Sequence, residues 1–197
     1  MKSNKSRLSA RTMATVAMMA AVSYLLMYLS FSVPFMPPFI KLDVSELPAL
    51  LTSFALGPVA GVGTALVKNL LHLLNTDTGG VGELSNFLLS AAFVGTAGLW
   101  YRSHKTRKGA LTGAVLGAVA MAQISVLTNY FIVYPVYTAF MPMEGILAAY
   151  NVILPVVDDL WDALLLFNMP FTFLKGMLST GICFLIYKKV APILRGR

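Results

Sequence analysis

The sequence predicts an all-α membrane protein, built as one compact bundle of six transmembrane helices, and three observations support this. Of the 197 residues, 57% are hydrophobic and only 12% are charged, and the mean hydropathy is +0.75. Such a composition excludes an ordinary soluble domain. Apolar runs recur along the chain with polar turns between them, and the positive charges gather in a few turns and ends. A single membrane domain over residues 1–197 is therefore expected.

The distribution of positive charge predicts the orientation in the membrane. Twelve of the fifteen Lys and Arg residues lie in segments 2–11, 102–108 and 188–197, and none of the eight acidic residues does. Cytoplasmic segments of membrane proteins are enriched in Lys and Arg, so both termini and the 102–108 turn are predicted to be cytoplasmic. Because these residues flank apolar spans, no nucleic-acid partner is expected. The predicted spans cover residues 13–31, 47–56, 59–74, 83–101, 109–139 and 162–187.

The first span, 13–31, follows a basic tail as a signal peptide would. Its apolar core is too long for a signal peptide and no convincing cleavage site follows, so an uncleaved helix is predicted. Four alanines recur along it at spacings of four, three and four, and they form a smooth stripe on one helix face: Ala10, Ala14, Ala17 and Ala21. Small residues let another helix approach closely. Packing inside the bundle and a docking surface for a partner protein both explain the stripe.

Segment 33–46 holds three prolines within five residues, which predicts an ordered extracellular loop. The runs 47–56 and 59–74 are joined by Gly57-Pro58 and predict a membrane hairpin whose tight turn faces the cytoplasm, with a re-entrant pair as the rival. Lys68 falls near the outer end of the second run. Its ammonium group is expected to reach the membrane interface, while its stem lies along apolar surface.

Segment 75–82 is rich in glycine and leads into the helix predicted over 83–101. Glycines let backbone N–H groups approach a ligand, and a helix N-terminus favours an acceptor there. The segment lacks the pattern of a phosphate-binding loop. Glu83 and Asn86 lie one turn apart, either as caps of the helix start or as polar groups of a pocket.

In the span 109–139, three glycines at spacings of four, Gly109, Gly113 and Gly117, predict a face for close helix packing. Asn129 follows in its outer half, as a ligand contact or as a bridge to a neighbouring helix.

The last span, 162–187, carries Lys175 deep into apolar sequence, one turn after Thr172. A charge at that depth is costly unless it is paired or faces a wet cavity, so a cavity or ligand role is favoured over a structural one.

The polar residues that are candidates for burial all lie in the outer halves or outer loops of the predicted spans. They predict a cup that opens outward, with four aromatic residues near it: Tyr130, Phe131, Tyr134 and Phe171. An apolar, aromatic pocket with a few placed polar groups suits a flat heteroaromatic small molecule.

Several segments together carry a resemblance to a known family. They are the alanine stripe, Lys41-Leu-Asp-Val-Ser-Glu-Leu-Pro48, Gly57-Pro58, Lys68-Asn-Leu-Leu-His72, Gly79-Gly-Val-Gly-Glu-Leu-Ser-Asn86 and Pro170-Phe-Thr-Phe-Leu-Lys-Gly176. The chain resembles the substrate-binding S components of energy-coupling-factor vitamin transporters, and most of all the riboflavin-specific ones. Where that family has Asn three residues before the lysine, this chain has Thr172.

The resemblance implies a multi-pass protein of a bacterial plasma membrane that captures riboflavin from outside. It also implies docking, through the alanine stripe, on a membrane scaffold (T component) that two cytoplasmic ATPases drive. Riboflavin would be the transported ligand and not a cofactor. The cup and the resemblance together give these candidate substrate-binding residues: Lys41, Leu42, Asp43, Gly80, Val81, Gly82, Glu83, Asn86, Asn129, Tyr130, Thr172 and Lys175.

Other functions have less support in the sequence. An intramembrane enzyme would need a motif such as G-x-S-x-G or H-E-x-x-H, which the chain lacks, and its acidic cluster (Asp158, Asp159 and Asp162) lacks a fourth metal ligand. We therefore expect neither enzyme activity nor a bound metal. A free-standing carrier would show repeated halves, and none is found. Flavin mononucleotide, thiamine and biotin stay open as alternative substrates.

Overall fold

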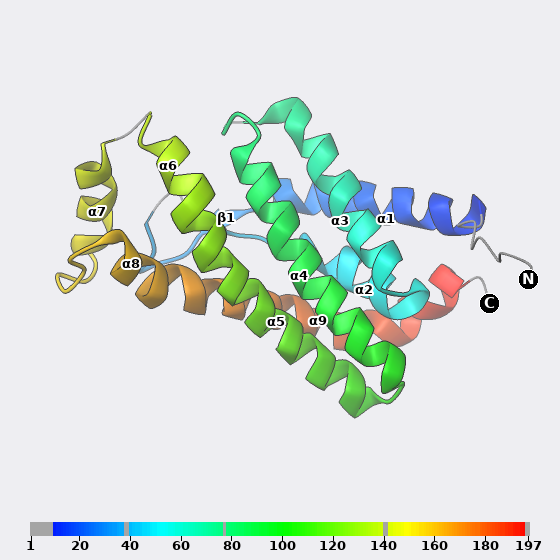
Figure 1. Ribbon diagram of the computed structural model, residues 1–197. Coiled ribbons are helices and arrows are strands. Elements are labelled where there is room, and N and C mark those ends of the chain that lie inside the picture. The colour runs from blue at the N-terminus through cyan, green and yellow to red at the C-terminus, as the bar shows by residue number, and fades with distance from the viewer. Residues whose placement is uncertain (1–9, 38–39, 77, 140–141, 196–197) are drawn as a thin grey trace, which may run out of the picture.

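The computed structural model describes residues 10–37, 40–76, 78–139 and 142–195, and over these residues the chain is mostly helical, as predicted. Four helical stretches are long and apolar enough to cross a membrane: Ala10–Tyr28, Val81–Ser103, Arg107–Tyr137 and Leu160–Leu194. The first residues of α1 and the last of α9 lie at one end of the bundle, and α7 lies at the opposite end (Figure 1). The predicted basic residues Lys2, Lys5, Arg7 and Arg197, as well as Pro38, lie outside the described residues.

Helix α1 (Ala10–Tyr28) packs on the bundle with one face only. Its buried residues are Thr15, Met19, Ala20 and Ser23. The Ser23 hydroxyl donates a hydrogen bond to the backbone carbonyl of Ser45, which ties the helix to the first loop. All four alanines of the stripe are exposed. Packing of the stripe inside the bundle, one of its two interpretations, is therefore wrong.

The first loop contains a short antiparallel pair, β1 (Phe31–Ser32) and β2 (Lys41–Leu42), which the sequence did not predict. It leads into a hairpin of α2 (Glu46–Leu56) and α3 (Pro58–His72), followed by a single turn, η1 (Leu73–Asn75). Gly57 forms the hairpin turn with φ +105°, a conformation that favours glycine, and Pro58 begins α3. The predicted hairpin turn is confirmed.

Helices α4 (Val81–Ser103) and α5 (Arg107–Thr128) are joined by the basic turn and pack along the glycine face. A Cβ atom on Gly113 would lie 2.8 Å from the carbonyl oxygen of Ala97, and one on Gly117 would meet the backbone of Phe93. Side chains larger than hydrogen would force the two helices apart, so the predicted packing face is confirmed.

Two π-helical turns interrupt the long helices at the end of the bundle near α7. The first, η2 (Asn129–Val133), joins α5 to α6 (Tyr134–Tyr137), and the second, η3 (Leu164–Asn168), joins α8 (Leu160–Ala163) to α9 (Met169–Arg195). Such turns shift the helical phase and are frequent at functional sites. Helix α7 (Met143–Asn151) covers this end, where Tyr134, Ile146, Tyr150 and Phe167 share a buried cluster. Helix α9 extends eight residues beyond the predicted end at 187.

Candidate functional site

Lys175 of α9 is paired with the first loop. Its Nζ donates to Oδ2 of Asp43 at 2.8 Å, and the two side chains are 12% and 10% exposed. The other oxygen of Asp43, Oδ1, accepts the backbone N–H of Ser45 at 2.8 Å. Burial works to raise the pKa of Asp43, but the ammonium groups of Lys175 and Lys68 and these hydrogen bonds outweigh it and lower the pKa from 3.8 to about 2. The pair is therefore charged at neutral pH.

Lys68 does not reach the membrane interface, so that prediction is wrong. Its Nζ lies 2.8 Å from Oε1 of Glu46, and both side chains are 0% exposed. Ser90 also donates to this oxygen at 2.8 Å, and the ammonium group of Lys68 donates to the Ser45 hydroxyl at 3.2 Å. The carboxylate, on the first residue of α2, compensates the charge inside the bundle, so the lysine need not extend to water.

A cavity of about 200 Å³ lies between α4, the α5–α6 stretch and α9. Five of the predicted substrate-binding residues line it: Gly82, Asn86, Asn129, Thr172 and Lys175. Phe171, predicted as an aromatic residue near the cup, also lines it. The rest of its wall is formed by residues that were not predicted as part of the site: Ile40, Ser85, Leu89, Met121, Ser125, Val133, Tyr137 and Asn168. The wall is thus mixed: apolar side chains alternate with amide, hydroxyl and ammonium groups.

Hydrogen bonds between the helices already use some of these polar groups. The hydroxyls of Ser125 and Thr172 lie 3.0 Å apart and connect α5 to α9. The Nδ2 of Asn129 donates to the Ser125 carbonyl at 2.8 Å and to its hydroxyl at 3.2 Å. Asn129 therefore lines the cavity and bonds to Ser125 of its own helical stretch, four residues earlier, and not to a neighbouring helix. Its contact with a ligand stays a prediction.

Seven predicted residues do not line this cavity: Lys41, Leu42, Asp43, Gly80, Val81, Glu83 and Tyr130. Tyr130 is partly exposed and packs edge-on against Phe131 and Trp161. Tyr134, expected near the cup, is buried behind the cavity wall in the cluster under α7. Substrate contacts from these seven residues stay predictions.

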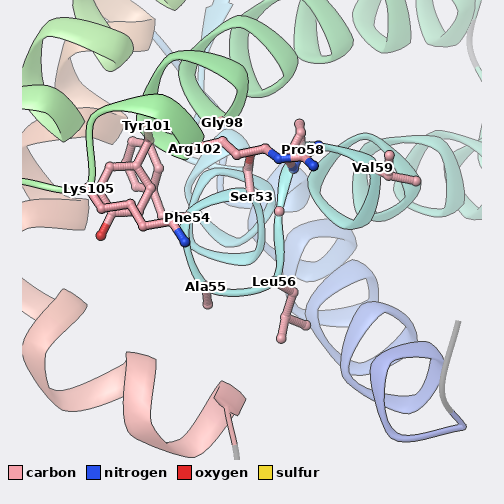
Figure 2. Close-up of a pocket in the computed structure, with 11 residues that line it drawn as sticks. Ser53, Phe54, Ala55, Leu56, Pro58, Val59, Gly98, Tyr101, Arg102 and Lys105 are labelled. Atoms are coloured by element: carbon pink, nitrogen blue, oxygen red, sulfur yellow. The ribbon is translucent and has the colours of Figure 1, made fainter. Parts of the chain in front are cut away.

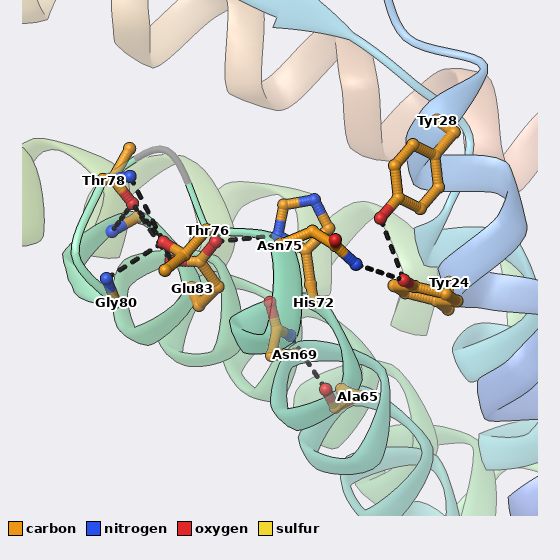
Figure 3. A network of polar contacts seen from close by, with 11 residues as sticks. Tyr24, Tyr28, Ala65, Asn69, His72, Asn75, Thr76, Thr78, Gly80 and Glu83 are labelled. Carbon is orange, nitrogen blue, oxygen red and sulfur yellow. Dashed lines mark hydrogen bonds and ion pairs between the residues drawn. The ribbon is translucent and has the colours of Figure 1, made fainter.

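Glu83 organises the glycine-rich loop (Figure 3). Its Oε1 lies 2.7 Å from Nδ1 of His72, and its Oε2 accepts hydrogen bonds from the hydroxyls of Thr76 at 2.8 Å and Thr78 at 3.0 Å. Gly80 adopts φ +92°, which turns the chain into α4. In this structure Glu83 thus ties His72 and the loop to the start of α4, while Asn86, one turn later, lines the cavity.

A second cavity, of about 700 Å³, lies at the other end of α2 and α4 (Figure 2). It is lined by the α2–α3 turn and by Tyr101, Arg102 and Lys105 near the basic turn. None of the predicted substrate-binding residues lies in it. We prefer the smaller cavity as the candidate site because several buried polar side chains converge there. Among the described residues, no three His, Cys, Asp or Glu side chains gather to hold a metal ion.

Asn168 is the most informative residue that the sequence did not single out. It lines the cavity and is 8% exposed. Its one signal in the sequence was an amide between apolar residues, seven positions before Lys175 and thus about two helical turns away.

Comparison with known proteins places these features in a family context. Residues 11–187 match the family model of the substrate-specific component of ECF transporters. The riboflavin transporter RibU of Staphylococcus aureus (strain TCH60) is 33% identical over 181 residues, which cover 92% of this chain and 90% of that protein. The riboflavin transporter FmnP of Bacillus subtilis (strain 168) is 27% identical over 187 residues, covering 92% and 93%.

The fold is similar to a solved structure as well. The S component in a study titled "Structure and mechanism of the S component of a bacterial ECF transporter" matches with a TM-score of 0.72 at 31% identity. The match covers 93% of this chain and 97% of that one.

Proposed function

Since the chain belongs to the family of substrate-specific components of ECF transporters, we propose that it is the riboflavin-binding uptake subunit of such a transporter. The observation that carries the proposal is the cavity between α4, the α5–α6 stretch and α9. Relatives that match over nine-tenths of the chain are riboflavin transporters, which supports the choice of vitamin and a transport role in place of catalysis.

The chemistry of the cavity suits a flavin. The flavin ring system is flat, with carbonyl oxygens and ring nitrogens that accept hydrogen bonds. Apolar side chains, among them Leu89, Met121 and Phe171, offer surface to the ring, while Asn86, Asn168 and Lys175 carry groups that bond to its polar edge.

For the membrane arrangement we infer six spans with both termini in the cytoplasm. Four stretches are long enough to span alone, and the α2–α3 hairpin adds two shorter helices of 11 and 15 residues. The basic residues of segments 102–108 and 188–195 lie toward the end of the bundle opposite α7, which supports a cytoplasmic location for that end (Figure 1). The cavity, closer to α7, then opens to the outside of a plasma membrane.

For the partners we infer a membrane scaffold, the T component, and two cytoplasmic ATPases. The exposed alanine stripe on α1 supports this, because a face of small side chains lets a helix of another protein approach closely in lipid. The residues that hold α1 to its own bundle lie on a different face.

The test of function is a titration of the purified protein in detergent with riboflavin, thiamine, biotin and flavin mononucleotide. We expect saturable quenching of riboflavin fluorescence, because the ring would stack on apolar and aromatic side chains. A protein purified from cells should also carry a yellow colour with a flavin absorbance spectrum. Saturable binding of thiamine or biotin with no binding of riboflavin would reassign the vitamin.

A further inference from the structure

Three polar side chains from separate elements form a buried hydrogen-bond chain beside the candidate site. The Tyr134 hydroxyl, at the start of α6, is hydrogen-bonded to the Tyr150 hydroxyl of α7. Tyr150 in turn donates to Oδ1 of Asn168 at 2.8 Å. Tyr150 is 0% exposed, so water does not replace these bonds.

This hydrogen-bond chain determines which end of the Asn168 amide, Oδ1 or Nδ2, faces the tyrosines. Tyr150 has one hydroxyl hydrogen and gives it to Oδ1, so the Tyr134 hydroxyl must donate to Tyr150. If the amide were reversed, its NH₂ group would donate to Tyr150, and Tyr150 would donate to Tyr134. The hydroxyl hydrogen of buried Tyr134 would then have only Asn168 itself as a further partner among the described residues, which disfavours the reversed amide.

The fixed orientation leaves Nδ2 of Asn168 as a donor for the cavity that this residue lines. Among the described residues the amide of Asn168 is hydrogen-bonded only to the two tyrosines, so at least one of the two Nδ2 hydrogens stays available to the cavity. Two other cavity donors differ in this respect, since the amide of Asn129 donates to Ser125 and the ammonium group of Lys175 donates to Asp43.

We propose that Asn168 contacts the ligand as a hydrogen-bond donor and that Tyr150 is a positioning residue that holds it in this orientation. The ligand group that pairs with it is an acceptor, a carbonyl oxygen or an unprotonated ring nitrogen. This inference rests on the proposed function, because a flavin ring presents such acceptors along its polar edge. Helix α7, outside the long helices, thereby contributes to specificity without lining the cavity.

The test is a double-mutant cycle on the full-length protein in detergent, with the dissociation constant of riboflavin as the readout. Tyr150→Phe frees the amide to rotate and should weaken binding about 10-fold, the value of one hydrogen bond. Asn168→Ala should weaken it by at least as much. In the Asn168→Ala background, adding Tyr150→Phe should cause no further loss, because the residue that it positions is gone.

Tyr24→Phe is the matched control. It removes a phenol hydroxyl that bonds to Tyr28 and Asn75 at the loop end of α3 (Figure 3). Because none of these three residues lines the cavity, the affinity should stay unchanged. Independent, additive losses for Tyr150→Phe and Asn168→Ala would overturn the positioning role, as would wild-type affinity for Tyr150→Phe.

One further variant and one comparison with the controls complete the test. If Tyr150→Phe fails to fold, Asn168→Leu decides: an affinity equal to wild type overturns the donor role, and a loss of about 10-fold supports it. Failure of the proposed function looks different, because wild type and Tyr24→Phe would then both fail to bind riboflavin.

Discussion

Lys175 lies where the first loop, α9 and the cavity meet, and its ammonium group donates to Asp43 while two further hydrogens stay available to a ligand. The sequence pointed to both residues, but not to their contact, which joins positions 132 residues apart. Sequence periodicity describes neighbours within one helix and says little about which loop residue meets which helix.

Asn168 shows a different limit of sequence interpretation. An asparagine in an apolar run has no distinctive spacing, and its place in the cavity wall depends on the π-helical turn Leu164–Asn168, which shifts the helical phase. A regular helical projection of this segment therefore gives the wrong neighbours.

Replacing Lys175 should weaken riboflavin binding. Lys175→Met removes a charge-assisted donor worth about 1.5 to 3 kcal/mol, or about 10- to 100-fold in affinity. Because the single change leaves Asp43 buried and unpaired, the informative comparison is Lys175→Met/Asp43→Asn with Asp43→Asn alone. If these two bind riboflavin equally well in a fluorescence titration, Lys175 is not a ligand.

Lys68 should instead determine stability. Lys68→Met leaves the carboxylate of Glu46 buried without a counter-charge, which costs about 3 to 5 kcal/mol. The double variant Lys68→Met/Glu46→Gln removes both charges and should recover most of the loss. Thermal unfolding in detergent measures this, and a Lys68→Met protein as stable as wild type would show that the pair contributes little.

The Asp43–Lys175 pair should be insensitive to pH in the neutral range. The pKa of Asp43 is lowered from 3.8 to about 2, so the stabilisation is complete above about pH 4 and is lost as the pH falls through 2. The difference in melting temperature between wild type and Asp43→Asn should therefore be constant from pH 5 to 8. A difference that vanishes as the pH falls to 5 would mean that the pKa of Asp43 is raised above its ordinary value and not lowered.

At the scale of elements, α1 and the α4–α5 pair show what small residues do in a membrane protein. On α5, glycines face α4 and hold the two helices in close contact. On α1, alanines with similar spacing face outward and leave a smooth surface. The spacing predicts a close-packing face in both cases, but it does not say whether the partner helix belongs to the same chain.

Ala17→Trp should abolish riboflavin uptake by cells and leave binding to the purified protein intact. The indole would block the outward face of α1, where the scaffold is proposed to dock, without touching the cavity. Met18→Trp, at an exposed neighbour outside the stripe, is the control and should retain uptake. Loss of binding together with uptake in Ala17→Trp would assign the stripe a structural role.

At the scale of the whole molecule, composition and charge predicted the helical membrane class, the order of the long helices and the α2–α3 turn. Five of the twelve predicted substrate-binding residues meet in one cavity. The sequence did not predict the β1–β2 pair, the two π-helical turns or the buried pair Lys68–Glu46. These features depend on tertiary contacts between distant segments, and such contacts cannot be predicted from the residue pattern within one segment.

The account depends on the ligand occupying the cavity between α4, the α5–α6 stretch and α9, and a pair of tryptophan substitutions on α4 tests this directly. Asn86 lines the cavity, whereas Leu84, two residues earlier, is 49% exposed and does not. The measurement is equilibrium dialysis of radiolabelled riboflavin against each purified variant, with thermal unfolding to verify the fold. We expect Asn86→Trp to lose at least about 100-fold in affinity, or about 2.7 kcal/mol, and Leu84→Trp to bind like wild type. A folded Asn86→Trp protein that binds riboflavin as tightly as wild type would contradict the assignment of this cavity.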